Sequence, residues 1–230
     1  MCYVPCGLPA AHLQSCMVAY EARLNADRRW ALSEGSRHFE EKSAVQETLR
    51  RIARRLDAIG VPYAISGGMA LFHHGYRRFT EVVDVLVSRE GLAKVRESLA
   101  GLGYVPTHAG SKNLRDSQSG VRIDFLVAGE FPGDGKPKPV AFPDPGQSFG
   151  NPAGVTIEHD GVRYLGLATL VDLKLASGMT NPGRLRDLSD VLELIRVLGL
   201  PADFAGRLNP FVRSKFLELH LASAAAGGDA

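Results

Sequence analysis

Two short apolar runs, residues 82–87 and 121–127, constrain the fold of this chain more than any other feature of its sequence. Both runs are rich in the residues that favour strands, and both have strand length rather than helix length. Each carries a single aspartate, Asp84 in the first and Asp124 in the second. A lone aspartate in a strand can lie on the polar face of a half-buried sheet. However, a buried carboxylate without a metal ion or a cation is costly, so two of them in apolar runs favour a site.

A glycine pair stands upstream of both aspartates, where a strand is expected to meet a helix. The extended run Tyr63–Ile65 leads into Ser66, Gly67 and Gly68, and a short helix is expected over 69–74. Without β-carbons, such a turn lets backbone N–H groups approach a phosphate, and the helix N-terminus adds a favourable field. Carboxylates from neighbouring strands hold hard cations such as Mg²⁺. A glycine pair alone is more often a tight turn, but the three features together predict a site for a nucleoside triphosphate and its metal ion.

The rest of the chain predicts an alternation of helices and strands. Residues 129–154 hold six of the thirteen prolines and six glycines, so only a short strand at 140–142 is expected there. Helices are expected over 44–59, 90–102, 169–177, 185–198 and 202–221, and a β-hairpin over 155–165.

Composition excludes several classes of protein. Hydrophobic residues make up 45% of the chain and charged residues 23%, which are ordinary values for a globular protein with its own core. No run approaches the length of a membrane span, and the N-terminus lacks a secretory signal, so we expect a cytoplasmic protein without membrane contact. Because the formal net charge is only +2, binding to nucleic acid would require a local basic patch.

The cysteines all lie near the N-terminus, at Cys2, Cys6 and Cys16. With His12 they offer side chains that zinc uses, but their spacing matches no standard zinc finger. The odd number argues against a disulfide framework. Free thiols in an N-terminal extension, reduced in the cytoplasm, are the favoured interpretation.

Over roughly residues 45–220, the chain resembles nucleotidyltransferase-fold proteins, and in particular the bacterial family related to the AbiEii-type abortive-infection toxins. That family has a hydrophobic residue before Gly-Gly, then Asp-hydrophobic-Asp, then a third acidic residue on a later strand. Two later helices have counterparts here as well. The matching segments are Tyr63–Leu71, His74–Gly75, Arg78–Glu81, Val83–Val87, Leu170–Ala176 and Arg186–Val191.

The resemblance implies transfer of a nucleotidyl group from an NTP to a hydroxyl group, with pyrophosphate leaving. It implies that Gly67 and Gly68 hold the triphosphate, with Ser66 nearby. It further implies that Asp84 binds Mg²⁺ or Mn²⁺, and that Asp124 binds metal and acts as a base. The acceptor stays open among tRNA, a protein and a small molecule, and an antitoxin is the protein partner that the family suggests.

Two cations are implied as phosphate contacts. Lys174, on an otherwise apolar helix, matches a family lysine that approaches the triphosphate, and the alternative is a solvated or snorkelling lysine. Arg78 fits a phosphate clamp better than its neighbour Arg77, although each is also typical of a surface position. Asp187 and Asp190, three residues apart on a predicted helix, are expected to offset neighbouring arginines.

One position departs from the family pattern. The family has two aspartates two residues apart, on one face of the strand. Here the second is Asp84, but the first is Val82, and Glu81 lies on the opposite face. Because a two-metal mechanism depends on the missing carboxylate, we expect weak or absent activity. The alternative to an enzyme is a catalytically degenerate nucleotide-binding or protein-interaction module, and a nucleic-acid-binding protein without nucleotide chemistry is less favoured.

The expected fold class is α/β in the broad sense (α+β), with the nucleotidyltransferase topology. It comprises a small mixed β-sheet flanked by helices and a helical C-terminal part. The expected segments are a poorly structured N-terminal extension at 1–40, a nucleotidyltransferase-like core at 41–165, C-terminal helices packed on the core at 166–222, and a disordered tail at 223–230.

Overall fold

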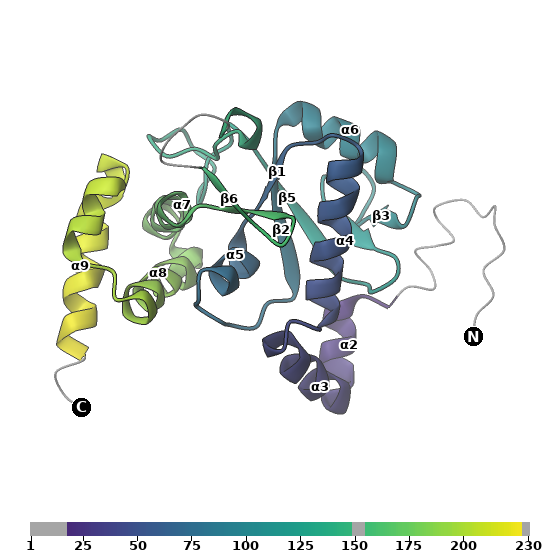
Figure 1. Cartoon of the computed structure of the whole chain (residues 1–230), viewed down its shortest axis with the longest axis horizontal. Helices are drawn as coiled ribbons and strands as arrows, with labels where there is room; N and C mark the ends of the chain where they lie inside the picture. The colour runs from purple at the N-terminus through teal and green to yellow at the C-terminus, as the bar shows by residue number, and fades with distance from the viewer. Residues whose placement is uncertain (1–17, 149–154, 227–230) are drawn as a thin grey trace. The chain divides into compact units, whose positions relative to one another are not determined.

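A computed structural model describes residues 18–148 and 155–226 of the chain. It confirms the α/β class, because helices flank a mostly antiparallel sheet and the C-terminal part is helical (Figure 1). The strands in the described residues are β1 (Tyr63–Ile65), β2 (Val82–Val87), β3 (Tyr104–Pro106), β4 (Leu114–Asp116), β5 (Arg122–Val127), β6 (Thr156–His159) and β7 (Val162–Leu165).

The strand order through the sheet is β3-β4-β5-β2-β1-β7-β6. Strand β1 pairs with β2 in antiparallel and with β7 in parallel orientation, so the sheet is mixed, as predicted. Among the described residues, no helix is both long and apolar enough to cross a bilayer. The helices are α2 (Tyr20–Ala26), α3 (Arg28–Phe39), α4 (Ala44–Ala58), α5 (Gly67–His73), α6 (Arg89–Leu99), α7 (Leu167–Thr180), α8 (Leu185–Leu198) and α9 (Pro210–Ala226).

The chain forms two compact units, and strands β2 and β5 each pass from the first unit to the second. The first unit comprises the described residues of Met1–Val61, Phe79–Val83 and Glu90–Phe125. The second comprises those of Pro62–Arg78, Asp84–Arg89 and Leu126–Ala230.

Helix α4 organises the first unit in the way its sequence predicts. Ser43 caps its N-terminus, accepting a hydrogen bond from the backbone N–H of Gln46 at 3.3 Å. Leu49, Ile52 and Leu56 repeat at helical spacing and are buried, so one face of the helix forms core. The opposite face carries charged side chains.

The N-terminal region differs from the expectation for residues 1–40, because α2 and α3 are regular helices in its described part. Polar contacts hold them. Tyr20 is buried, donates from its hydroxyl to Glu34 at 3.2 Å, and donates its backbone N–H to Gly120 O at 3.1 Å. Asp27 caps α3 by accepting from Trp30 N at 3.0 Å. Hydrophobic periodicity does not reveal helices that are anchored by polar groups.

The first unit also contains two strands that the sequence did not indicate. Strands β3 and β4 have three residues each, too few for a periodic pattern, and exist through their mutual pairing, with Tyr104 opposite Asp116.

The prediction of a strand at 140–142, in the second unit, was wrong. Phe142 there makes only two backbone hydrogen bonds, with Gly129 and Glu130.

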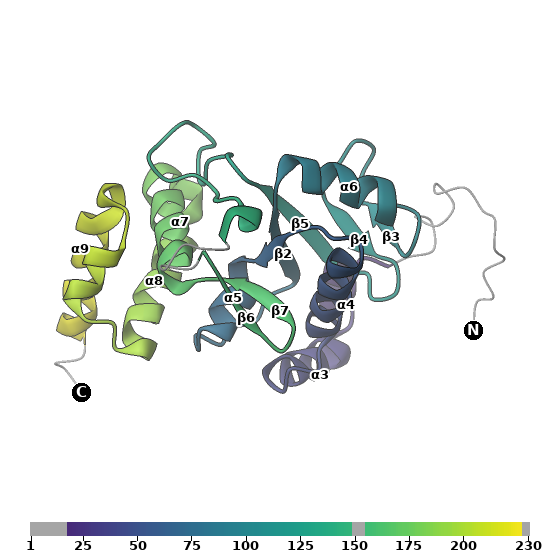
Figure 2. The ribbon, with the colours of Figure 1, turned by 45° about the horizontal axis from the view of Figure 1, so that its top comes forward.

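The second unit has a helical layer whose helices α7, α8 and α9 lie side by side (Figures 1 and 2). Its core includes Leu175, Val191 and Phe216, one from each helix. Gly178 of α7 has no room for a β-carbon, which would approach the side chain of Leu188 on α8. The two helices therefore pack closely.

The predicted helix over 202–221 is divided in two. A 3₁₀ turn covers Ala202–Arg207, and α9 begins at Pro210, where Asn209 caps by accepting from Phe211 N at 3.0 Å. Helix α9 continues to Ala226, into the segment expected to be a disordered tail. The high helix propensity of its alanines accounts for the extension.

Candidate functional site

The glycine turn and Asp84 meet in the second unit. Strand β1 runs directly into Ser66, whose backbone N–H donates to the backbone oxygen of Asp84 at 2.9 Å. Gly67, the first residue of α5, has a φ of +57°, and a β-carbon there would overlap the Asp84 carboxylate. Only glycine fits both the left-handed backbone and the close approach. The structure therefore brings together two of the residues that the sequence assigned to one site.

Ser66 occupies the N-cap position of α5 without capping it. Its backbone is extended, its side chain is buried, and its hydroxyl makes no capping hydrogen bond. The first N–H groups of a helix lack partners within the helix and are satisfied by caps, water or ligands. Because the Ser66 side chain does not cap α5, the backbone N–H groups at the start of this helix can donate to other acceptors.

Val82 lies on the Asp84 face of β2. Side chains alternate along a strand, so Val82 and Asp84 share a face and Val83 points the other way. The burial pattern agrees, since Val82 and Asp84 are half-buried whereas Val83 is fully buried. An apolar side chain therefore lies on the same strand face as Asp84, two residues before it.

Asp124 of β5 has a cationic neighbour that the sequence analysis missed. Its Oδ1 atom lies 3.0 Å from Nε of Arg122, two residues away on the same strand face. Neither atom has a well-aligned hydrogen bond, so the contact is mainly electrostatic. Burial raises the pKa of the Asp124 carboxyl, and the Arg122 guanidinium opposes the shift. Because residues two apart in a strand share a face, the sequence positions of Arg122 and Asp124 could have predicted this pair.

Lys174 of α7 is buried and bound to two carboxylates. Its Nζ donates to Asp187 Oδ1 at 2.8 Å and to Asp190 Oδ2 at 2.7 Å, both on α8. Ser177 donates to the other Asp187 oxygen at 2.7 Å. Burial acts to raise the pKa of Asp187, but the charge and hydrogen bond of Lys174 outweigh it and hold this pKa below its usual range. Lys174 is therefore neither solvated nor snorkelling.

Arg78 joins the same cluster. Its Nη2 donates to Asp190 Oδ2 at 3.1 Å, and its Nε lies 2.9 Å from Asp190 Oδ1 as an ion-pair contact without hydrogen-bond alignment. The two cations expected to contact phosphate thus converge on one buried carboxylate. Asp187 and Asp190 pair with Lys174 and Arg78 rather than with neighbouring arginines of their own helix. We refer to Arg78, Lys174, Asp187 and Asp190 as the α7–α8 ion cluster.

Metal ligands are few in the described part of the chain. No group of three or more His, Cys, Asp or Glu side chains within it is placed to hold a metal ion. The N-terminal positions Cys2, Cys6, His12 and Cys16 lie outside the described residues.

No protein-family model matches the sequence, and no curated protein matches it either. The fold is similar to solved structures at low identity. ANT(2")-Ia in complex with adenylyl-2"-tobramycin is 15% identical, with 79% of this chain and 98% of that chain covered and a TM-score of 0.45. JHP933 from Helicobacter pylori is 17% identical, with 78% and 89% covered and a TM-score of 0.42. An antigenic nucleotidyltransferase-like protein from Paracoccidioides brasiliensis is 16% identical, with 79% and 87% covered and a TM-score of 0.40. Function is therefore inferred from the residues of this chain.

Proposed function

We propose that this chain is a nucleotidyltransferase-like protein, related to the AbiEii-type toxins, that transfers a nucleotidyl group from an NTP to a hydroxyl acceptor. The observation that carries the proposal is the contact zone between Gly67 and Asp84. A residue without a β-carbon, at the start of a helix and against a carboxylate, supplies backbone N–H donors beside an oxygen ligand. A triphosphate with its counter-ion needs this combination, whereas a structural turn does not need the carboxylate.

The proposed roles follow from the position of each group. The N–H groups of Gly67 and Gly68 bind phosphate oxygens next to Ser66, and Asp84 is a ligand of Mg²⁺ or Mn²⁺. Because Mg²⁺ is commonly held by one or two carboxylates together with substrate phosphates, Asp84 suits one such ion. Val82 offers no oxygen, so these residues do not suit the two-metal arrangement. When bound, the ion neutralises phosphate charge.

The chemical step would join the acceptor oxygen to the α-phosphorus and break the bond to pyrophosphate. Asp124 is the proposed base that takes the proton of the acceptor hydroxyl. Burial raises its pKa, which moves the carboxylate towards the basicity of a general base. The role requires that Asp124 exchange its contact with Arg122 for the hydroxyl. Rate enhancement would come mainly from positioning and charge neutralisation.

Arg78 and Lys174 would contact the triphosphate only by exchanging carboxylate oxygens for phosphate oxygens. On this proposal, Lys174→Ala and Arg78→Ala each weaken NTP binding by about tenfold or more, because each removes a charge-assisted hydrogen bond. The matched control is Lys215→Ala, which breaks an exposed ion pair with Glu218 on α9 in the same unit. Affinities equal to that of the control would leave these two cations with a structural role alone.

The second candidate function is a nucleotide-binding or protein-interaction module that has lost catalysis. Val82 favours it, because a bridging carboxylate is missing from the metal site. An antitoxin would be its natural partner by the family resemblance. The two candidates share the nucleotide site and differ only in turnover.

The deciding experiment supplies each labelled NTP with Mg²⁺ or Mn²⁺ to the full chain. Acceptors are tRNA, cell protein and a small-molecule fraction, tested separately. Asp84→Asn is the control, since it keeps the shape of the side chain and removes the charge. Metal-dependent transfer that is lost in Asp84→Asn supports the enzyme. Binding of NTP without transfer supports the degenerate nucleotide-binding module, and a wild-type chain that binds no NTP contradicts both nucleotide-dependent functions and leaves only the protein-interaction module.

A further inference from the structure

A pocket in the first unit is lined by arginines of α4. Its volume is about 340 Å³, and Arg51, Arg54 and Arg55 line it together with Tyr104 of β3 and Asp116 of β4. Small-molecule sites in proteins begin near this size, at roughly 300 Å³. Every residue that lines the pocket belongs to the first unit, whereas the proposed glycine turn and Asp84 belong to the second.

The one carboxylate that lines the pocket is already committed. Asp116 Oδ2 lies 2.8 Å from Nη2 of Arg51 and accepts from its Nε at 2.9 Å. Asp116 Oδ1 accepts the backbone N–H of Gln118 at 2.8 Å. Arg51 also lies 3.8 Å from Glu47. Both carboxylate oxygens of Asp116 therefore already have partners, so Asp116 has little capacity to neutralise the charges of Arg54 and Arg55.

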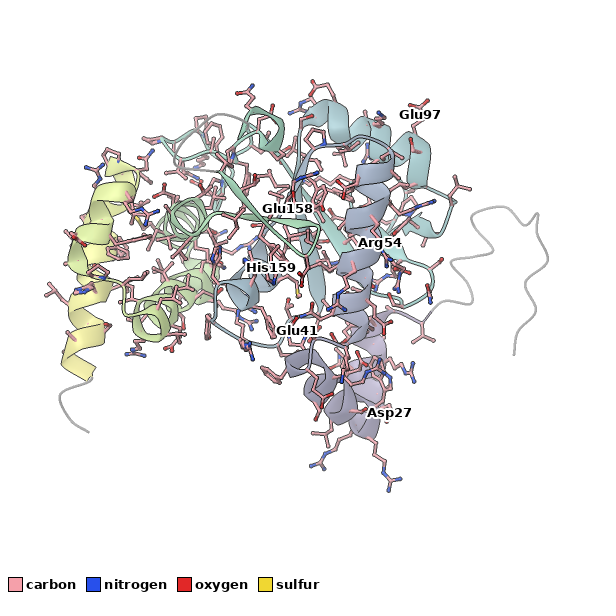
Figure 3. All side chains as sticks on the ribbon, viewed as in Figure 1. Asp27, Glu41, Arg54, Glu97, Glu158 and His159 are labelled. Atoms are coloured by element: carbon pink, nitrogen blue, oxygen red, sulfur yellow. The ribbon has the colours of Figure 1, made fainter. Side chains whose placement is uncertain are left out.

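Arg54 and Arg55 form no ion pair with a carboxylate anywhere in residues 18–148 or 155–226. Both are exposed, and Figure 3 shows Arg54 on α4. The Nε of Arg54 donates to the backbone oxygen of Arg50 at 3.1 Å, which fixes the direction of the side chain. The two terminal amino groups of Arg54 are left to bind a ligand. Three guanidinium charges thus face one carboxylate around the pocket.

The three arginines also influence the hydroxyl group of Tyr104, which lines the pocket. Burial and the Asp116 carboxylate raise the pKa of the Tyr104 hydroxyl to about 12, and the charges of Arg51, Arg55 and Arg54 oppose this shift. Arginines three and four residues apart on a helix also repel one another and destabilise it.

We propose that this pocket is an anion site that binds the phosphate group of a phosphate ester through Arg54 and Arg55. The planar fork of a guanidinium matches two oxygens of a phosphate, and two such groups without carboxylate partners are suited to one phosphate group. Arg51, fixed by Asp116, contributes charge behind them. The ester is either a phosphodiester of an RNA strand or a small phosphorylated molecule, and both present the same recognised group.

The test compares two double variants of the full chain. Arg54→Gln/Arg55→Gln removes both proposed contacts. Arg28→Gln/Arg29→Gln removes the same charge from adjacent, exposed arginines of α3 in the same unit that do not line the pocket. The probes are a fluorescent oligouridylate of about ten nucleotides and inorganic pyrophosphate. EDTA is present throughout, which removes metal-dependent binding at the proposed nucleotide site.

We expect Arg54→Gln/Arg55→Gln to weaken at least one probe by about tenfold or more, and the control to leave affinity unchanged. For the oligouridylate, the slope of log affinity against log salt should fall in magnitude by about 0.7, since one phosphate contact is lost. Loss for the oligouridylate alone assigns the phosphate to an RNA strand. Loss for pyrophosphate, with or without loss for the oligouridylate, assigns the site to a small phosphorylated molecule.

Two results would overturn the proposal. One is equal affinity in the two double variants, and the other is a wild-type chain that binds neither probe. Misfolding is not expected to obscure the result, because the substitutions relieve repulsion and should keep the melting temperature at or above that of wild type. If the double variant melts lower, Arg55→Gln alone gives the same comparison with a smaller change.

Discussion

Gly67 meets two requirements at once, a left-handed backbone and a space that the Asp84 carboxylate limits. Gly129, also in the second unit, has a φ of +82° but nothing within 4 Å of a β-carbon. A side chain at Gly129 would introduce backbone strain alone, whereas a side chain at Gly67 would introduce backbone strain and overlap with Asp84. Comparing substitutions at the two positions therefore isolates the contact on which the proposed nucleotide site depends.

We expect Gly67→Ala to destabilise the chain more than Gly129→Ala. Left-handed strain costs each variant about 1–3 kcal/mol, and only Gly67→Ala adds displacement of the Asp84 carboxylate. Gly67→Ala should also lose NTP binding, whereas Gly129→Ala should retain it. Urea unfolding and NTP titration measure the two effects. Equal losses in both variants would mean that the approach of Gly67 to Asp84 is unimportant.

Val82→Asp should create an acidic pair with Asp84, because Val82 shares a strand face with Asp84. Without divalent metal it should lower the melting temperature, since two like charges then crowd one site. With Mg²⁺ and NTP it should raise the melting temperature and increase nucleotidyl transfer by orders of magnitude. A variant that gains neither metal-dependent stability nor turnover would show that Val82 is not what limits activity. Rapid turnover by the wild-type chain would show the same.

Asp172 of α7 gives a pH-dependent prediction. Burial raises its pKa to about 6, although its Oδ1 accepts the backbone N–H of Asn209 at 2.9 Å. The folded chain therefore binds a proton more tightly than the unfolded chain, and stability falls as pH rises from about 4 to 6. Asp172→Asn keeps the acceptor without the charge, so it should stabilise at pH 7 by about 1–3 kcal/mol. This gain should vanish near pH 4 in urea unfolding, and a gain independent of pH would contradict the assignment.

At the scale of elements, the α7–α8 ion cluster decides how α7 and α8 face each other. Its four charged side chains are largely buried, in contrast to the exposed pair of Lys215 and Glu218. Buried charges are costly to leave unpaired, while exposed pairs contribute little. Together with the close packing of Gly178 on Leu188, the cluster permits one arrangement of the two helices.

Lys174→Met should destabilise the chain by about 3–5 kcal/mol, because it leaves the Asp187 and Asp190 carboxylates with too few partners. Lys215→Met is the control, with an expected change of at most about 1 kcal/mol. Adding Asp187→Asn to Lys174→Met should recover part of the loss, since it removes one unpaired charge. Denaturant unfolding of the four proteins measures these differences. A loss for Lys174→Met no larger than that of the control would rule out a structural cluster.

At the scale of the whole molecule, the N-terminal helices belong to the first unit. Arg115 of β4 forms an ion pair with Glu21 at 2.7 Å, and Glu34 accepts the backbone N–H of Ala44 at 2.9 Å. Both contacts link α2 and α3 to residues of the segment 41–165, which the sequence assigned to the core. Their removal should therefore affect the folding of the whole unit.

Deletion of residues 1–40 should lower the melting temperature by several degrees or more, because it leaves Arg115 and the Ala44 N–H without these partners. Deletion of residues 1–17 is the matched control, since it removes none of the described contacts. Thermal unfolding by circular dichroism compares the two. Equal melting temperatures would mean that residues 18–40 contribute nothing to the stability of the unit, as expected for an extension.

The sequence by itself determined the elements with strong local patterns. Helix α8 and strand β2 have the predicted bounds, and α4 differs from its prediction by one residue at its end. In α4 and α8, burial follows the helical period, so spacing alone reports the face that packs, whereas β2 alternates only over its first four residues and is buried on both faces after them. The glycine turn before α5 was local in its backbone, because the left-handed φ of Gly67 needs only glycine's conformational freedom, whereas its close approach to Asp84 is a tertiary contact.

Only the tertiary structure decided which charges meet. Arg78 and Asp190 are separated by 112 residues, and Lys174 and Asp187 by 13, yet all four form one cluster. The sequence predicted phosphate contacts for Arg78 and Lys174 and local arginine partners for the two aspartates, because a partner across such separations depends on how α7 packs on α8. The same holds for β3, β4, α2 and α3, whose stability comes from pairing and polar contacts with other segments. Periodicity records that a side chain is buried, whereas its partner is set by the energy of packing the whole chain.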